Sequence, residues 1–163
     1  MNHATDANDP IDRYVNLDET QAAADLTAIL ARTFPASGRQ VDFTPTEVVL
    51  CLAAMYVVPF NKFGGNNAQD APSPVKELAA LFKRPPSSVL AKMANLTGAR
   101  PNGGKGEAAA AQVLLADGGA GLLRCYRAVI AAARALGITE HSLPDFLPVR
   151  PWLAGGKLPT PTA

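Results

Sequence analysis

The segment RPPSSVLAKMANL, residues 84–96, combines small and polar side chains in a way that suits contact with DNA bases. A serine hydroxyl can donate or accept a hydrogen bond, an asparagine amide can pair with adenine, and a lysine can reach guanine or a phosphate. If this segment is a helix lying in a groove of duplex DNA, the residues on its outer side would contact the bases. We therefore predict four base-side residues: Ser87, Ser88, Lys92 and Asn95.

The apolar residues of the same segment predict a helix over about 86–96 with one buried face. They stand at i, i+1, i+4 and i+7, and are Val89, Leu90, Met93 and Leu96. A helix over about 74–83 precedes it, and its apolar stripe consists of Val75, Leu78, Ala79 and Phe82. Two helices of about ten residues with a tight break between them have the proportions of a helix-turn-helix, here over 73–96. Such pairs also occur in all-α proteins without a nucleic-acid partner, and small polar residues near a helix start also serve as caps.

The distribution of charge places the basic residues around this segment. The net charge of the whole chain is only +1, but residues 1–50 hold eight acids and three bases, whereas residues 51–115 hold seven bases and three acids. A polyanionic partner should therefore meet the middle of the chain. We predict five phosphate contacts there: Lys62, Lys83, Arg84, Arg100 and Lys105.

The remaining sequence predicts an all-α fold, a compact bundle of about five or six helices. Further helices are expected over about 18–33, 44–57, 107–116 and 119–136, the last two separated by Asp117-Gly118-Gly119. Thr44, Pro45 and Glu47 form a capping-box pattern at the start of the second of these. The predicted organisation is a flexible acidic tail over 1–16, the helical domain over 17–145 and a Pro-rich extension over 146–163.

Residues that could support catalysis or metal binding are few. Cys51 and Cys125 lie in apolar stretches and are expected to be buried free thiols, while His3 and His141 stand 138 positions apart. We therefore predict no catalytic residue, no metal site and no cofactor. No apolar run approaches the roughly 18 residues that could span a bilayer, and the N-terminus lacks a signal pattern. The expected location is the cytoplasm, without a membrane role.

Several of these residues, in this order and spacing, resemble a known protein family. Residues 48–107 are similar to the N-terminal region that precedes the nuclease domain in many bacterial HNH-type restriction endonucleases. The matching positions are Tyr56, Pro59, Phe60, Lys62, Leu78, Ala79, Arg84, Pro86, Ser87, Val89, Lys92, Asn95 and Leu96, followed by the Gly-rich segment GGKGE at 103–107. The resemblance implies a module that reads DNA.

The chain departs from the family pattern in two ways. Lys83 replaces the usual glycine of the turn, and Pro85 stands where a serine or threonine would cap the helix. The two histidines and the asparagine of an HNH nuclease site, arranged around one metal, are also missing. The resemblance therefore implies the DNA-reading part of such a protein without the cutting part.

These observations predict a duplex DNA-binding module in a restriction-like or regulatory role, working with double-stranded DNA and with a second copy or a nuclease partner. The alternative is a protein-interaction or dimerisation module with no nucleic-acid role. In that case the Ala-rich helix 18–33 and the Pro-rich tail would contact the partner. The helix belongs to a predicted solvated acidic face that includes Asp18, Glu19 and Asp25.

Overall fold

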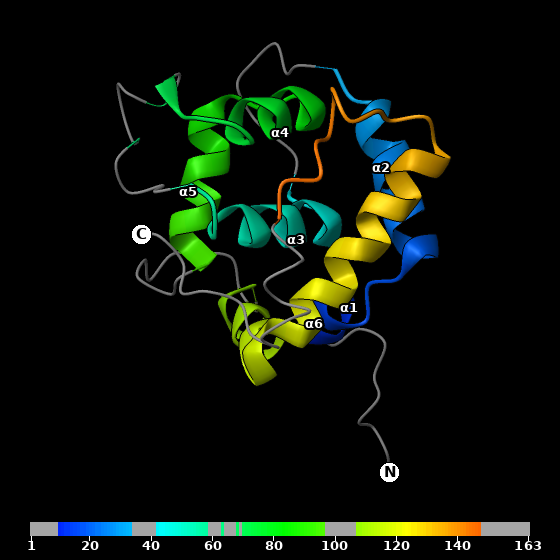
Figure 1. Ribbon diagram of the computed structural model, residues 1–163, viewed down its shortest axis with the longest axis vertical. Helices are drawn as coiled ribbons and strands as arrows, with labels where there is room; N and C mark the ends of the chain where they lie inside the picture. Colours follow the sequence, from blue (N-terminus) through cyan, green and yellow to red (C-terminus); the bar gives the residue numbers. More distant parts are fainter. Residues whose placement is uncertain are drawn as a thin grey trace.

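The computed structural model describes residues 10–33, 42–58, 63, 68, 70–96 and 107–147, and within them the fold is all-α (Figure 1). Its helices are α1 Pro10–Val15, α2 Glu19–Leu30, α3 Pro45–Ala54, α4 Val75–Phe82, α5 Pro86–Leu96 and α6 Glu107–Ala135. The described residues contain no strand. The predicted all-α class is confirmed. None of the described helices is both long and apolar enough to cross a membrane.

Helix α3 is the centre of the bundle, because all ten of its residues are buried and all five other helices contact it. The predicted capping box is confirmed at its start. The Thr44 hydroxyl accepts a hydrogen bond from the Glu47 backbone N–H, and the Glu47 carboxylate accepts one from the Thr44 backbone N–H at 2.8 Å. Pro45 occupies the first turn, where a missing N–H costs nothing. The cap therefore fixes where this fully buried helix begins.

Helices α4 and α5 are separated by the three residues 83–85 and pack against each other. The predicted stripes of both helices are buried, including Leu78 and Phe82 on α4 and Val89 and Met93 on α5. Helix α5 begins at Pro86, and the Ser88 N–H donates to the Pro85 carbonyl at 2.9 Å. The predicted start at residue 86 is confirmed, without a serine or threonine cap.

Helix α6 folds back on itself at a pair of glycines. Gly118 and Gly119 have φ angles of 72° and 89°, in the left-handed region that glycine adopts without strain. A β-carbon on Gly121 would lie 3.4 Å from the Leu114 Cα, although seven residues of a straight helix span about 10.5 Å. The predicted division into two helical segments at Asp117-Gly118-Gly119 is therefore present within α6. In Figure 1 the first turns of α6 run at an angle to its longer second part.

Helix α1 corrects the predicted flexible tail over 1–16. Tyr14 and Leu17 are buried against the core, and α1 contacts α6. The Arg124 guanidinium on α6 donates to the Val15 carbonyl at 2.9 Å, where it satisfies a carbonyl near the end of the short helix. Of these two core residues, only Tyr14 falls in the predicted tail, where the acidic composition concealed it, whereas Leu17 belongs to the predicted helical domain over 17–145. Residues 1–9 lie outside the described part of the chain.

The chain that follows α6 packs back on the bundle as far as residue 147. Ile138, Leu143 and Leu147 are buried, and the Phe146 ring meets the Tyr126 ring edge-on at 5.3 Å between centroids. The predicted Pro-rich extension from 146 therefore begins with core contacts, and its residues 148–163 lie outside the described part. Cys51 and Cys125 are both buried free thiols, as predicted.

Candidate nucleic-acid interface

The outer face of α5 presents the four residues predicted to contact bases. Ser87 is exposed, whereas Ser88, Lys92 and Asn95 are half-buried. At roughly 100° per residue, these four are centred nearly opposite the buried face that contains Val89 and Met93. Ala91 lies on the same face, four residues from both Ser87 and Asn95, and is also half-buried. Only its methyl group projects between those two polar residues. Such a face lets another molecule come close to the helix backbone.

Lys92 does not project freely from this face. Its ammonium nitrogen lies 4.7 Å from the centre of the Phe43 ring, a distance at which the negative face of an aromatic ring attracts a cation. Phe43 comes from the segment before α3, two residues before the start of that helix. The structure thus brings Phe43 to the outer face of α5, and no local pattern in the sequence indicated that contact.

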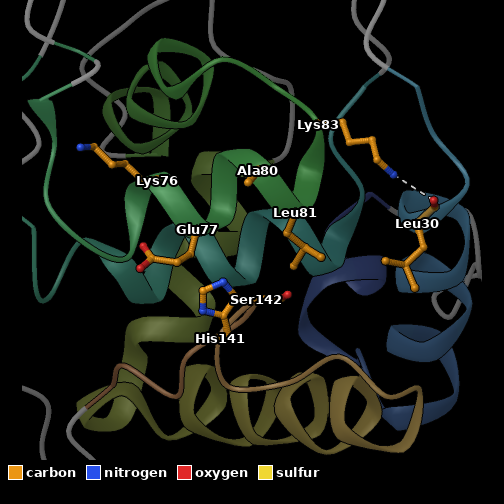
Figure 2. A pocket seen from close by; sticks show the side chains of 8 residues that line it. All are labelled: Leu30, Lys76, Glu77, Ala80, Leu81, Lys83, His141 and Ser142. Carbon is orange, nitrogen blue, oxygen red and sulfur yellow. Dashed lines mark hydrogen bonds between the residues drawn. The ribbon is translucent and has the colours of Figure 1, made fainter.

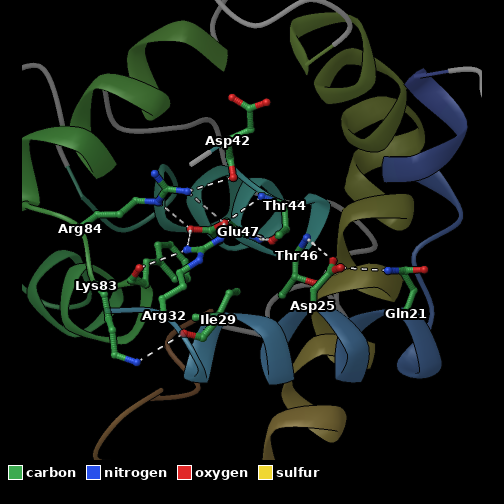
Figure 3. A network of polar contacts seen from close by, with 11 residues as sticks. Gln21, Asp25, Ile29, Arg32, Asp42, Thr44, Thr46, Glu47, Lys83 and Arg84 are labelled. Atoms are coloured by element: carbon green, nitrogen blue, oxygen red, sulfur yellow. Dashed lines mark hydrogen bonds and ion pairs between the residues drawn. The ribbon is translucent and has the colours of Figure 1, made fainter. Parts of the chain in front are cut away.

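Arg84 is where the predicted interface is wrong (Figure 3). Its side chain is 2% exposed, and the guanidinium donates through Nε to the Glu47 Oε2 at 2.8 Å. It also donates to the Asp42 carbonyl at 3.1 Å and stacks on Phe43, with its Cζ 3.8 Å from the ring centre. A guanidinium held in this way cannot reach a DNA phosphate. Its role is to join the α4–α5 break to the start of α3.

Glu47 is the acid at the centre of this network, and its side chain is fully buried. Arg32, just after α2, donates to both carboxylate oxygens at 2.8 and 2.9 Å, and to the Phe82 carbonyl at 3.1 Å. Burial pushes the pKa of Glu47 up, but hydrogen bonds from Arg32, Arg84 and the Thr44 backbone outweigh it, so the pKa lies below its ordinary value. The carboxylate therefore stays charged and links α2, α3 and the α4–α5 break.

Lys83 has a structural role that differs from the predicted phosphate contact. Its backbone is left-handed, with φ 58° and ψ 46°, at the end of α4. The sequence departure noted at this position, lysine in place of glycine, thus falls on a residue whose conformation favours glycine. The Lys83 ammonium donates to the carbonyls of Leu30 at 2.9 Å and Ile29 at 3.4 Å, at the C-terminal end of α2 (Figures 2 and 3). A cation there also offsets the negative end of the helix dipole.

The other predicted phosphate contacts, Lys62, Arg100 and Lys105, lie outside the described residues, as does the Gly-rich segment 102–106. Their placement relative to α5 is therefore not part of the described geometry. Of the five predicted phosphate contacts, Arg84 is buried in an ion pair and Lys83 caps the end of α2. The other three remain predictions.

A second surface feature is a groove of about 460 Å³ between the end of α2, helix α4 and the turn after α6 (Figure 2). Its apolar part consists of Leu30, which is 45% exposed, together with Ala80 and Leu81. Lys76 and His141 are both exposed at the groove. One carboxylate oxygen of Glu77 is buried there without a hydrogen-bond partner. The groove thus offers an apolar surface with an unsatisfied acceptor beside it.

Two further polar contacts correct or extend the sequence-based picture. Asp25, predicted to be solvated, is buried and accepts hydrogen bonds from the Thr46 hydroxyl at 2.8 Å and from Gln21 at 2.9 Å. The Tyr126 hydroxyl donates to Asp145 at 2.6 Å and accepts from the Leu147 N–H at 3.2 Å. Burial and the adjacent Asp145 carboxylate raise the pKa of Tyr126 far above its ordinary value, so the hydroxyl stays protonated. Both contacts tie helices to their neighbours.

The described residues contain no group of three or more His, Cys, Asp or Glu side chains that could hold a metal ion. Comparison of the chain with models of protein families, with characterised proteins and with solved structures gives no match.

Proposed function

We propose that the chain is a duplex DNA-binding module, in a restriction-like or regulatory role, with α5 as the helix that enters the major groove. The observation that carries the proposal is the division of α5 into a buried apolar face and an opposite face of small and polar residues. A major groove about 12 Å wide admits one helix, and only short side chains let its backbone approach the bases. Ser87, Ser88 and Ala91 meet that requirement.

In the proposed complex, Asn95 pairs with an adenine edge and Lys92 contacts guanine or a phosphate, while the serines donate to or accept from base edges. Lys62, Arg100 and Lys105 supply phosphate contacts that set the register of the helix. Arg84 and Lys83 stabilise the position of α5 without contacting DNA. Arg84 joins the α4–α5 break to Glu47, and Lys83 joins it to the end of α2.

The number of available cations gives the expected salt dependence. With Lys92 and the three predicted contacts outside the described residues, about four phosphates would be neutralised, and the slope of log K against log salt would be about −3.6. Raising the salt from 50 to 200 mM should then weaken binding by roughly 100-fold. Fluorescence anisotropy with labelled plain and base-modified duplexes measures this. Absence of binding at 50 mM salt, to either duplex, would contradict the proposal.

A dimerisation module is the second candidate, and the groove beside Leu30 favours it. A large apolar side chain that is 45% exposed at a groove with Ala80 and Leu81 is suited to contact with a second copy of the chain. Analytical ultracentrifugation of the wild type and of Leu30→Asp tests this candidate. It requires a wild-type dimer that Leu30→Asp dissociates and that persists at high salt. A wild-type monomer at high concentration would exclude it.

A further inference from the structure

Phe43 contacts both a buried side chain of the ion-pair network and a side chain on the outer face of α5. The Arg84 Cζ lies 3.8 Å from the centre of its ring, and the Lys92 ammonium lies 4.7 Å from that centre. One half-buried aromatic ring therefore carries two cations, one belonging to the buried ion-pair network and one belonging to the proposed reading face.

The ring is held in place on its inner side. Arg84 cannot move, because its guanidinium is bound to the Glu47 carboxylate and to the Asp42 carbonyl. The Phe82 ring meets Phe43 edge-on, with 6.4 Å between centroids and an interplanar angle of 79°. Such an edge-to-face arrangement is favourable for aromatic pairs. The Phe43 ring is thus a fixed surface, whereas the Lys92 side chain has four rotatable bonds in its stem.

We propose that Phe43 is a positioning residue for DNA reading, which holds the Lys92 ammonium at one place beside α5. This inference rests on the proposed function, because it explains how Lys92 would be restricted to one base or phosphate instead of several. A lysine ordered before binding loses less conformational freedom on binding, so its contact contributes more to the affinity. The ring itself would touch no DNA.

The proposal separates the position of Lys92 from its charge. Removing the ring leaves the number of cations at the interface unchanged, so the salt dependence of binding should stay as in the wild type. Only the affinity should fall, by about fivefold, as expected for one cation–ring contact and one ordered side chain. Removing Lys92 should instead lower both the affinity and the salt slope, the slope by about one unit.

The binding test uses the full chain with Phe43→Leu, Lys92→Ala and both together, on the plain or modified duplex that the wild type binds. We expect Phe43→Leu to weaken binding about fivefold with an unchanged salt slope, and to have no further effect when Lys92 is already alanine. Phe43→Tyr keeps the ring and should keep the affinity. A Phe43→Leu loss that persists in the Lys92→Ala background would overturn the inference, as would an unchanged affinity.

A second measurement needs no DNA and separates this inference from the proposed function. Methylene protons of Lys92 near the ring should have NMR shifts displaced by the ring current, and Phe43→Leu but not Phe43→Tyr should abolish the displacement. Undisplaced Lys92 shifts in the wild type would overturn the contact itself. If the Lys92 shifts are displaced but the wild type binds no duplex, the Lys92–Phe43 contact is confirmed. In that case both the proposed function and the positioning role are wrong. If the wild type binds and Phe43→Leu binds equally well, only the positioning role fails.

Discussion

Replacement of Glu47 by glutamine keeps the shape of the side chain and removes the charge that Arg32 and Arg84 share. The wild-type carboxylate accepts two hydrogen bonds from Arg32, one from the Arg84 Nε and one from the Thr44 N–H, all between 2.8 and 2.9 Å. A glutamine amide presents one oxygen and one NH₂ group. The NH₂ group would point donor hydrogens at guanidinium donors.

The cost follows from the burial of the partners. Arg84 is 2% exposed and Arg32 is 14% exposed, so water cannot replace the lost acceptor for Arg84 and replaces it only in part for Arg32. Breaking a buried ion pair by removing one partner costs about 3–5 kcal/mol, which is a large share of a typical folding free energy of about 5–15 kcal/mol. For a domain of this size that loss corresponds to a melting temperature lower by about 6–20 °C.

Urea unfolding followed by circular dichroism measures the free energy of unfolding of the wild type and of Glu47→Gln. The matched control is Glu19→Gln, which makes the same chemical change at an exposed residue in the first turn of α2. We expect the control to lose less than about 1 kcal/mol. A loss in Glu47→Gln no larger than in the control would refute the assignment of Glu47 as the acid that holds three segments together.

The same pair of proteins gives a pH dependence of known sign. Since the pKa of Glu47 in the folded state lies below its ordinary value of 4.5, its contribution to stability is present above that value and is lost as the pH falls through the folded pKa. The difference in unfolding free energy between the wild type and Glu47→Gln should therefore be constant near pH 7 and shrink below pH 4.5. A difference that grows on acidification would contradict the sign of the shift.

Three further substitutions test other contacts through the free energy of unfolding. Lys83→Ala should be less stable than Lys83→Gly by about 1 kcal/mol, because both lose the ammonium contacts to α2 but only alanine keeps a β-carbon in the left-handed conformation; equal stabilities would contradict this. Gly119→Ala should lose roughly 1–3 kcal/mol at φ 89°, and an unchanged stability would argue against the bend in α6. Tyr126→Phe should lower the free energy of unfolding by about 1–3 kcal/mol and speed hydrogen exchange at the buried Leu147 amide, which donates to the Tyr126 hydroxyl. An unchanged exchange rate at Leu147 would contradict that hydrogen bond.

Local patterns in the sequence were sufficient for most of the fold. The capping box at Thr44 and Glu47 marked the start of α3, and apolar spacing identified the buried faces of α4 and α5. The Gly118-Gly119 pair marked the bend in α6. Each of these signals acts within a few residues, where spacing and side-chain type determine the backbone. The short helix α1 was missed because its six residues, fewer than two turns of helix, give too few periodic positions.

The candidate site could be predicted only in part, because its chemistry depends on contacts between distant residues. Glu47 meets Arg32 and Arg84 from 15 and 37 positions away, and nothing in the local sequence distinguishes Arg84 from a surface arginine. The sequence presents Asp25 as one more acid of an acidic helix, whereas in the fold it accepts hydrogen bonds from Gln21 on the same helix and from Thr46, 21 positions later. The sequence identified which side of α5 faces outward, but the contact of Phe43 with Lys92 required the tertiary fold.

The most direct test of the central proposal is the affinity of Lys92→Ala/Asn95→Ala for duplex DNA, measured by fluorescence anisotropy at one fixed salt concentration. Lys76→Ala is the matched control, because Lys76 is an exposed lysine of α4 at the groove rather than on the outer face of α5. We expect the double variant to keep the wild-type melting temperature and to bind on the order of 100-fold more weakly, with the control near the wild type. Equal affinity of the double variant and the wild type would contradict the proposal that α5 reads DNA.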